Sequence, residues 1–208
     1  QLKAMTSLWP AELTKPQIIA TGFWFPAIPP TPPSQKPLLV ALLQHEIPTH
    51  LGAKEQLIRL LQRWAREQTD WTIVLQPDHP WRSAPSFNNV HTNNPPNVVV
   101  AAPEQMLGLL SRCTACLSVS SPWSLAAMMW GRIPVVVGDY GIQAEQRTTN
   151  FFGCGAMHRL RDMGGLHKLQ ELPLVNQGWI KAMGGRIQDG PLRLLSSLDT
   201  LGSGTTAP

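Results

Sequence analysis

Apolar runs alternate with segments of helical periodicity through the middle of the chain. The runs are rich in leucine and β-branched residues and have no polar side, which is typical of parallel strands covered on both faces. They predict strands over residues 38–43, 71–75, 97–101, 116–119 and 133–137.

Helices are expected between these strands. The strongest signal covers residues 53–67, where apolar side chains recur at helical spacing and the opposite face is charged. Further helices are expected over 103–110, from Pro122 to a stop at Gly131, over 166–172 and over 187–198. Strands that alternate with helices imply right-handed crossovers, so the fold class is predicted as α/β, a parallel, doubly wound, Rossmann-like sheet flanked by helices.

The ends of the chain read differently from its middle. Residues 1–36 hold a predicted strand over 18–22 and a proline-rich connector, and we expect them to be the remnant of an N-terminal domain. The first residue is Gln rather than Met, which agrees with a partial chain. Residues 37–200 are predicted to form the Rossmann-like domain, with a long polar loop over 76–96, and residues 201–208 a disordered tail.

Charge and hydropathy narrow the class of protein. The net charge is +4 and no block of five Lys or Arg residues occurs, so nucleic acid is not the expected partner. No apolar stretch reaches the roughly 18 to 20 residues of a membrane span, and no signal pattern opens the chain. We therefore expect a soluble, cytoplasmic protein, with peripheral contact to a membrane left open. No motif indicates an oligomeric state.

The three cysteines carry no predicted chemistry. Cys113 and Cys116 have CxxC spacing but lie in apolar surroundings, so buried free thiols are favoured over a redox pair or half a zinc site. The six histidines are scattered and no carboxylate cluster has ligand spacing, so no metal site and no cofactor are predicted.

Residues 116–137 hold the main candidate for binding. They read as strand, tight turn, helix and strand, with hydroxyls at Ser120 and Ser121 and with Pro122 at the first helical position. A helix that begins at the carboxyl end of a strand favours an anion. Ligands of open α/β sheets bind beyond that edge, which directs attention to loops 44–49, 76–82, 118–124 and 138–143.

The second of these loops carries His79 directly before Pro80. An imidazole held there can donate a hydrogen bond to a phosphate or ribose oxygen. The alternatives are a histidine in a surface loop and, for the serines, ordinary helix capping worth about 1 kcal/mol.

The combination resembles the C-terminal half of GT-B glycosyltransferases, especially bacterial sialyltransferases, polysialyltransferases and capsule-sugar transferases. Their His-Pro motif matches Asp78-His79-Pro80, and their serine motif matches Ser118-Val-Ser-Ser121. Residues 43–48, and the segment from Ser120 to Gly141, are also similar to an uncharacterised group of bacterial glycosyltransferases. The resemblance covers residues 38–155.

The resemblance implies transfer of a sugar from a nucleotide donor, with cytidine the first choice of base and uridine the second. The nucleotide sugar is a substrate, no essential metal is implied, and the acceptor is a glycan or a lipid. The residues expected to bind the donor are His79, Pro80, Ser118, Ser120, Ser121, Trp123, Gln44, His45 and Asp139.

The chain also departs from these families. Their catalytic Asp/Glu-Asp/Glu-Gly tripeptide is absent, so no catalytic residue is assigned. Gln76 stands where a lysine or arginine precedes the His-Pro pair, and Arg82 is the candidate to replace that cation. Asp139 and Glu145 either bind ribose or sugar hydroxyls or are solvated loop acids. Trp81 and Trp123 either stack on a base or pack in the core.

Two alternatives to a transferase remain open. One is a nucleotide-sugar 2-epimerase or hydrolase, with Asp139, Glu145 and His158 as candidate catalytic groups. The other is a non-catalytic domain that binds a nucleotide or a partner protein.

Overall fold

The structure, a computed structural model, describes residues 29, 31–141, 144–145, 148–173, 175–184 and 190–203. The chain forms two compact units, one made of residues 28–180 and the other of residues 1–27 with 181–208. The strand predicted over 18–22 lies outside the described residues, and the domain limits at 36 and 200 stay predictions.

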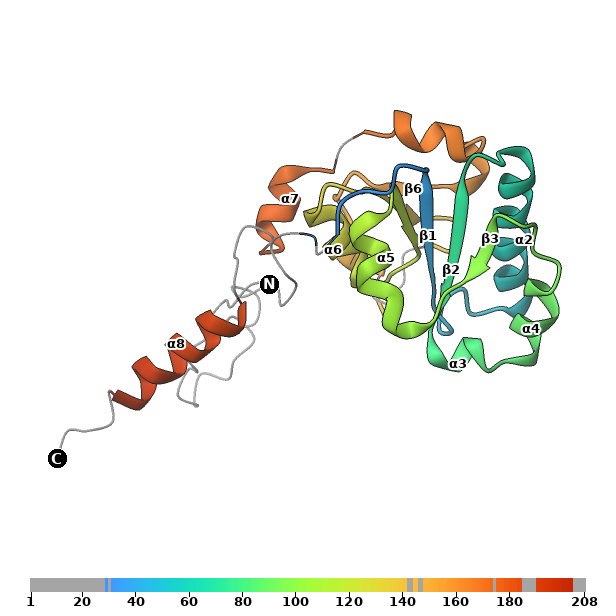
Figure 1. Ribbon diagram of the computed structural model, residues 1–208. Coiled ribbons are helices and arrows are strands. Elements are labelled where there is room, and N and C mark those ends of the chain that lie inside the picture. Colours follow the sequence, from blue (N-terminus) through green and yellow to red (C-terminus); the bar gives the residue numbers. More distant parts are fainter. Residues whose placement is uncertain are drawn as a thin grey trace. The chain divides into compact units, whose positions relative to one another are not determined.

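The larger unit is built on a six-stranded sheet of order β3-β2-β1-β4-β5-β6 in which every pairing is parallel. The strands are β1 Leu38–Leu43, β2 Thr72–Pro77, β3 Val98–Val100, β4 Ala115–Ser118, β5 Ile133–Val137 and β6 Met157–His158. Helices lie on both faces of this sheet (Figure 1). The predicted Rossmann-like α/β fold is confirmed.

The α-helices of this unit are α2 Leu51–Glu67, α3 His79–Arg82, α4 Pro85–His91, α5 Met106–Arg112, α6 Trp123–Met129 and α7 Gln177–Ala182, which ends just beyond it. Short 3₁₀-helices are η1 Pro103–Gln105, η2 Thr148–Phe151, η3 Leu160–Asp162 and η4 Leu166–Glu171. The smaller unit contains α8 Gly190–Ser203, so residues 201–203 of the predicted tail are helical. None of the helices in the described parts is long and apolar enough to cross a membrane.

Strand alternation divides the buried side chains between two cores. Val135 and Val137 share one core with the apolar face of α2, whereas Val136 packs in a second core with Met128 of α6. Leu61 of α2 is fully buried in the first core. Burying a leucine side chain contributes about 1.5–3 kcal/mol, so the predicted apolar face of α2 is a main source of stability.

Two parts of the larger unit differ from the sequence-based expectation. The predicted loop 76–96 contains α3 and α4, because Asp78 caps α3 with its side chain and a proline occupies the first turn. Helix α3 has four residues, and α4 lies in a polar segment rich in serine and asparagine, so neither shows an apolar periodicity in the sequence. Strand β6 was also not predicted, because it has two residues, too few to form a pattern.

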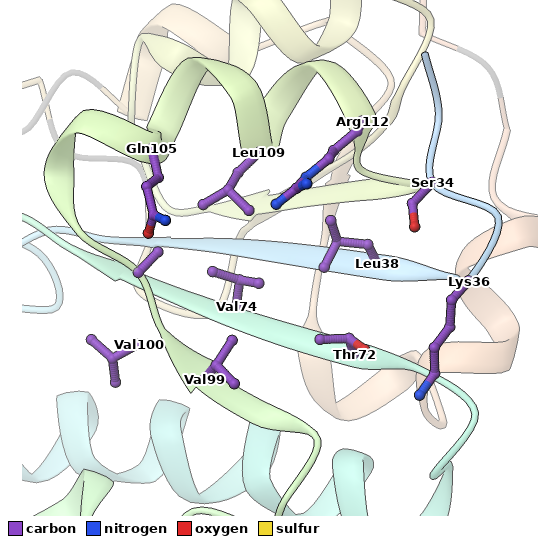
Figure 2. Close-up of a pocket in the computed structure, with 11 residues that line it drawn as sticks. Ser34, Lys36, Leu38, Thr72, Val74, Val99, Val100, Gln105, Leu109 and Arg112 are labelled. Atoms are coloured by element: carbon purple, nitrogen blue, oxygen red, sulfur yellow. The ribbon is translucent and has the colours of Figure 1, made fainter. Parts of the chain in front are cut away.

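A hollow of about 430 Å³ lies on the face of the sheet that α5 covers. Figure 2 shows Val74 and Val99 in its apolar part and Lys36 and Arg112 among its polar residues. Thr72, the first residue of β2, also lines it. Val100 and Ala101, at the carboxyl end of β3, line it as well, so the hollow runs along this face of the sheet and does not lie beyond the strand ends, where binding was predicted.

Candidate functional site

A cavity of about 270 Å³ lies at the carboxyl ends of β1 and β2. The chain adds β2 and β3 on one side of β1 and then returns to add β4 on the other side of β1. The sheet therefore has a topological switch point beside β1. Open α/β sheets bind ligands at such switch points. The lining residues are Leu42, Leu43, Gln44, Gln76, Pro77, Asp78, His79, Pro103, Met106, Ser121 and Trp123.

Four residues predicted to bind the donor meet in this cavity: Gln44, His79, Ser121 and Trp123. They follow β1, β2 and β4, so three separate connections converge on one space. His79 is exposed at the start of α3, whereas Ser121 is buried in the turn before α6. The imidazole and the hydroxyl thus border one cavity, as the motifs predicted.

Gln44 fixes the turn that carries Ser121. Its Oε1 accepts a hydrogen bond from the backbone N–H of Ser120 at 2.9 Å, and its Nε2 donates to Ser120 Oγ at 3.1 Å. Ser120 is buried and does not line the cavity. It acts through Gln44 as part of the scaffold, which corrects the expectation of direct donor binding.

Asp78 links the first two loops at the sheet edge. Its Oδ1 accepts from the backbone N–H of Trp81 at 3.1 Å and caps α3, while its Oδ2 accepts from the backbone N–H of His45 at 2.7 Å. The His45 ring also lies 2.9 Å from Oδ2 through Nδ1. His45 and Pro80 are exposed and lie outside the lining residues. Their expected donor contacts stay predictions.

Lys54 of α2 lies close to this linkage. Its ammonium donates to the carbonyl of His45 and lies 5.4 Å from the centre of the Trp81 ring. Burial lowers the pKa of Lys54, and the charge of Asp78 partly opposes that shift. Trp81 itself is buried and packs edge to face on Phe87, so it belongs to the core.

Ser118 is a correction to the predicted site. It is the last residue of β4 and is fully buried, and its Oγ lies 2.5 Å from Oγ of Ser124 in α6. A hydroxyl so placed joins strand to helix and cannot reach a ligand. The helix also begins one residue later than predicted, because Pro122 is the N-cap and makes no side-chain capping bond.

Asp139 bonds to the backbone of a neighbouring segment. Its Oδ2 accepts from the backbone N–H of Leu160 at 2.7 Å and so holds the start of η3. Asp139 and Glu145 are both exposed, and neither lines the cavity. The expected contact of Asp139 with a ribose or sugar hydroxyl stays a prediction.

Arg82 does not replace the missing cation. Its guanidinium donates to the carbonyl of Ala101 in the β3–η1 connection, and the residue does not line the cavity. Among the described lining residues, the ionisable side chains are those of Asp78 and His79. Any anion held here therefore depends on His79 for positive charge.

The apolar walls of the cavity were not predicted as part of the site. Leu42 lies near the carboxyl end of β1, which Gln44 follows, and Pro103 and Met106 follow the carboxyl end of β3. Ligands of open α/β sheets bind beyond the carboxyl ends of the strands, and this connection also begins at such an end. The prediction selected loops with polar side chains, so it did not include this apolar connection.

The cysteines are buried free thiols, as predicted. Burial raises the pKa of Cys113 to about 12 and raises the pKa of Cys116 well above its usual range. Both sulfurs thus stay protonated at neutral pH and are not nucleophiles.

Solved structures share this fold at low sequence identity. A structure described as a putative UDP-N-acetylglucosamine 2-epimerase from Listeria monocytogenes has a TM-score of 0.53 and 14% identity, over 84% of this chain and 48% of that chain. The UDP-GlcNAc 2-epimerase from Neisseria meningitidis, bound to UDP-GlcNAc, has a TM-score of 0.53 and 13% identity, over 80% and 46%. The chain thus spans about half the length of these structures, and the likeness shows the fold alone.

No curated protein sequence matches the chain. One family model does, over residues 15–184, which is more than half of the chain. By that match the chain belongs to the family described as "Putative glycosyltransferase (DUF6716)".

Proposed function

We propose that the larger unit binds the nucleotide part of a sugar donor in the cavity at the ends of β1 and β2, as the donor-binding half of a glycosyltransferase. The observation that carries the proposal is the meeting of His79 and Ser121 in one cavity. Family membership supports the reaction class, and the switch-point position supports a nucleotide.

In this proposal His79 and Ser121 meet the charge that develops on the departing phosphate. An imidazole N–H and a hydroxyl are both hydrogen-bond donors, and donors aimed at developing charge stabilise the transition state. Helix α6 has only seven residues, so we assign the anion to these two side chains more than to the helix dipole. Trp123 lines the cavity beside Ser121 and offers a ring face to the base or sugar.

The donor is a nucleotide sugar, with cytidine the first choice of base and uridine the second, and the acceptor is a glycan or a lipid. The cavity of about 270 Å³ is near the lower end of ligand sites, which run from about 300 Å³ upward. It therefore suits a nucleoside with its phosphate, while the sugar extends beyond it.

Calorimetric titration with CMP, UDP and GDP tests the site. We expect His79→Ala and Ser121→Ala each to weaken binding by about 10-fold or more, since a hydrogen bond to a charged group is worth about 1.5–3 kcal/mol. His50→Ala and Ser196→Ala are matched controls, because both residues are exposed and neither lines the cavity. Unchanged affinity in both cavity variants would remove the assignment, and absence of binding by the wild type would remove the donor itself.

Product analysis separates a transferase from its alternatives. A transferase consumes the nucleotide sugar only when an acceptor is present, whereas a 2-epimerase converts it alone. The fold is shared with structures that are named as epimerases, so fold likeness does not favour either activity. Nucleotide binding without turnover, with acceptors supplied, would indicate a non-catalytic domain.

A further inference from the structure

Gln76 carries a buried hydrogen-bond acceptor that none of the described residues uses. The residue lies near the end of β2, is 6% exposed and lines the cavity. Its Oε1 is buried and has no hydrogen-bond partner in the part of the chain that the structure describes. A buried, unpaired carbonyl is costly, so native proteins pair almost all such groups.

The other end of this carboxamide faces a backbone carbonyl. Nε2 points to the carbonyl oxygen of Ala102 at 3.5 Å. Rotating the amide by half a turn would place Oε1 against that carbonyl, acceptor against acceptor. The unpaired atom is therefore the oxygen, and it requires a donor.

Gln76 is more deeply buried than His79, whereas Ser121, the other group proposed to hold the phosphate, is as buried as Gln76. His79 is exposed, whereas Gln76 is almost fully buried. Burying a charged phosphate costs far more than burying a neutral ring, so the phosphate belongs near His79 and the base near Gln76.

The surroundings of Gln76 suit a flat ring with one polar edge. Six of the eleven lining residues are apolar: Leu42, Leu43, Pro77, Pro103, Met106 and Trp123. Gln44 and Asp78 already bond to other parts of the protein. A sugar would need several polar partners, whereas a base needs one or two along its edge.

We propose that Oε1 of Gln76 accepts a hydrogen bond from an N–H group on the edge of a pyrimidine base, either the amine of cytosine or the imide of uracil. This inference rests on the proposed nucleotide binding. The choice of a pyrimidine follows the proposed donor, with cytidine first and uridine second. Gln76 is thus a residue that determines base specificity.

Gln76→Met tests the role of the residue. Methionine has a similar length and no polar head, and Ala102 keeps the bond that its carbonyl accepts from the N–H of Gln105 at 3.1 Å. We expect the variant to keep a Tm at or above that of the wild type and to bind CMP or UDP about 10-fold more weakly. A lower Tm with unchanged affinity would show a structural role and overturn the proposal.

Gln62→Met is the matched control. Gln62 is a glutamine of α2 that is 4% exposed, and its Nε2 donates to Oδ1 of Asn94 at 2.8 Å. The same substitution there removes a bond made within the protein. We expect a lower Tm and unchanged nucleotide affinity, the opposite of the result for Gln76.

Modified nucleotides identify the group that donates to Gln76. N4,N4-dimethyl-CMP and N3-methyl-UDP lack the amine and imide N–H groups, respectively. The wild type should bind the modified form of its preferred nucleotide about 10-fold more weakly, while Gln76→Met should not distinguish the two forms. Equal losses in both proteins, or a preference for GDP, would overturn the inference but leave nucleotide binding intact. Absence of binding by the wild type would instead overturn the proposed function together with this inference.

Discussion

Gln44 and Ser120 are joined by a pair of hydrogen bonds, one to the backbone N–H of Ser120 and one to its hydroxyl, across 76 positions of sequence. The carboxamide of Gln44, which follows β1, thereby connects the end of this strand to the turn between β4 and α6. Sequence motifs present Gln44 as a donor-binding residue, and the structure adds that it positions the turn bearing Ser121.

Replacing Gln44 with Leu should destabilise the protein and weaken nucleotide binding. The buried N–H of Ser120 would lose its partner, which costs about 1–3 kcal/mol of the free energy of unfolding. Urea unfolding and calorimetry measure the two effects. Gln56→Leu, on the exposed face of α2, should change stability by less than about 0.5 kcal/mol. Equal stability of the two variants would contradict the positioning role.

Asp78 should stabilise α3 through its cap. Asp78→Ala removes the acceptor for the N–H of Trp81 and both contacts with His45, so we expect a loss of about 1–2 kcal/mol in the free energy of unfolding. Asp78→Asn keeps an oxygen for the cap and should lose less. Chemical denaturation of the three proteins tests this order, and a reversed order would show that the cap is not the stabilising contact.

The hydroxyls of Ser118 and Ser124 should behave as a coupled pair. Ser124→Ala leaves the buried hydroxyl of Ser118 without this partner and should cost about 1–3 kcal/mol, whereas Ser118→Ala should cost less, because Ser124 keeps its hydrogen bond with Cys116. The double variant should cost less than the sum of the two single changes, which a double-mutant cycle measures. Nucleotide affinity should not change in Ser118→Ala, and a loss of affinity without a loss of stability would restore Ser118 to the site.

Stability should depend on pH through His158. Burial lowers the pKa of this histidine in the folded protein, so between that lowered value and the usual pKa of about 6.5 the unfolded chain binds more protons. The free energy of unfolding should therefore fall as the pH falls through this window.

His158→Gln should flatten that part of the profile, while His50→Gln, at an exposed position, should leave it unchanged. The slope from one group stays below about 1.4 kcal/mol per pH unit, and the partial burial of His158 makes it smaller. Thermal or urea unfolding at pH 5 and pH 7.5 gives the comparison. Identical profiles for the wild type and His158→Gln would show that this imidazole is not the source.

Regular patterns made most of the fold predictable. The strand over 133–137 has no polar face and was predicted with the observed bounds, as was the strand over 38–43. Helices α3 and α4 were not predicted, because they are short and depend on a cap and prolines rather than on an apolar face. The strand order β3-β2-β1-β4-β5-β6 was not predicted, because the crossover rule sets the hand of each connection and not which strands are neighbours.

The position of the candidate cavity in the fold was predictable from the sequence, but the contacts of its side chains were not. The edge rule brought His79 and Ser121 to one cavity because it depends only on where strands end. That rule does not tell which partner a side chain at the edge of the sheet will bond to. Ser118 and Asp139 bond to Ser124 and to the backbone of Leu160, and those partners depend on packing.

Both oxygens of Asp78 point to protein partners, one to the first turn of α3 and one to His45. Among the described residues around the cavity, Asp78 is the only carboxylate. A carboxylate that braces two loops is poorly placed to deprotonate an attacking hydroxyl. Under the proposed function, His79 and Ser121 would receive the leaving group in this cavity, and Asp78 would brace the two loops rather than activate the nucleophile.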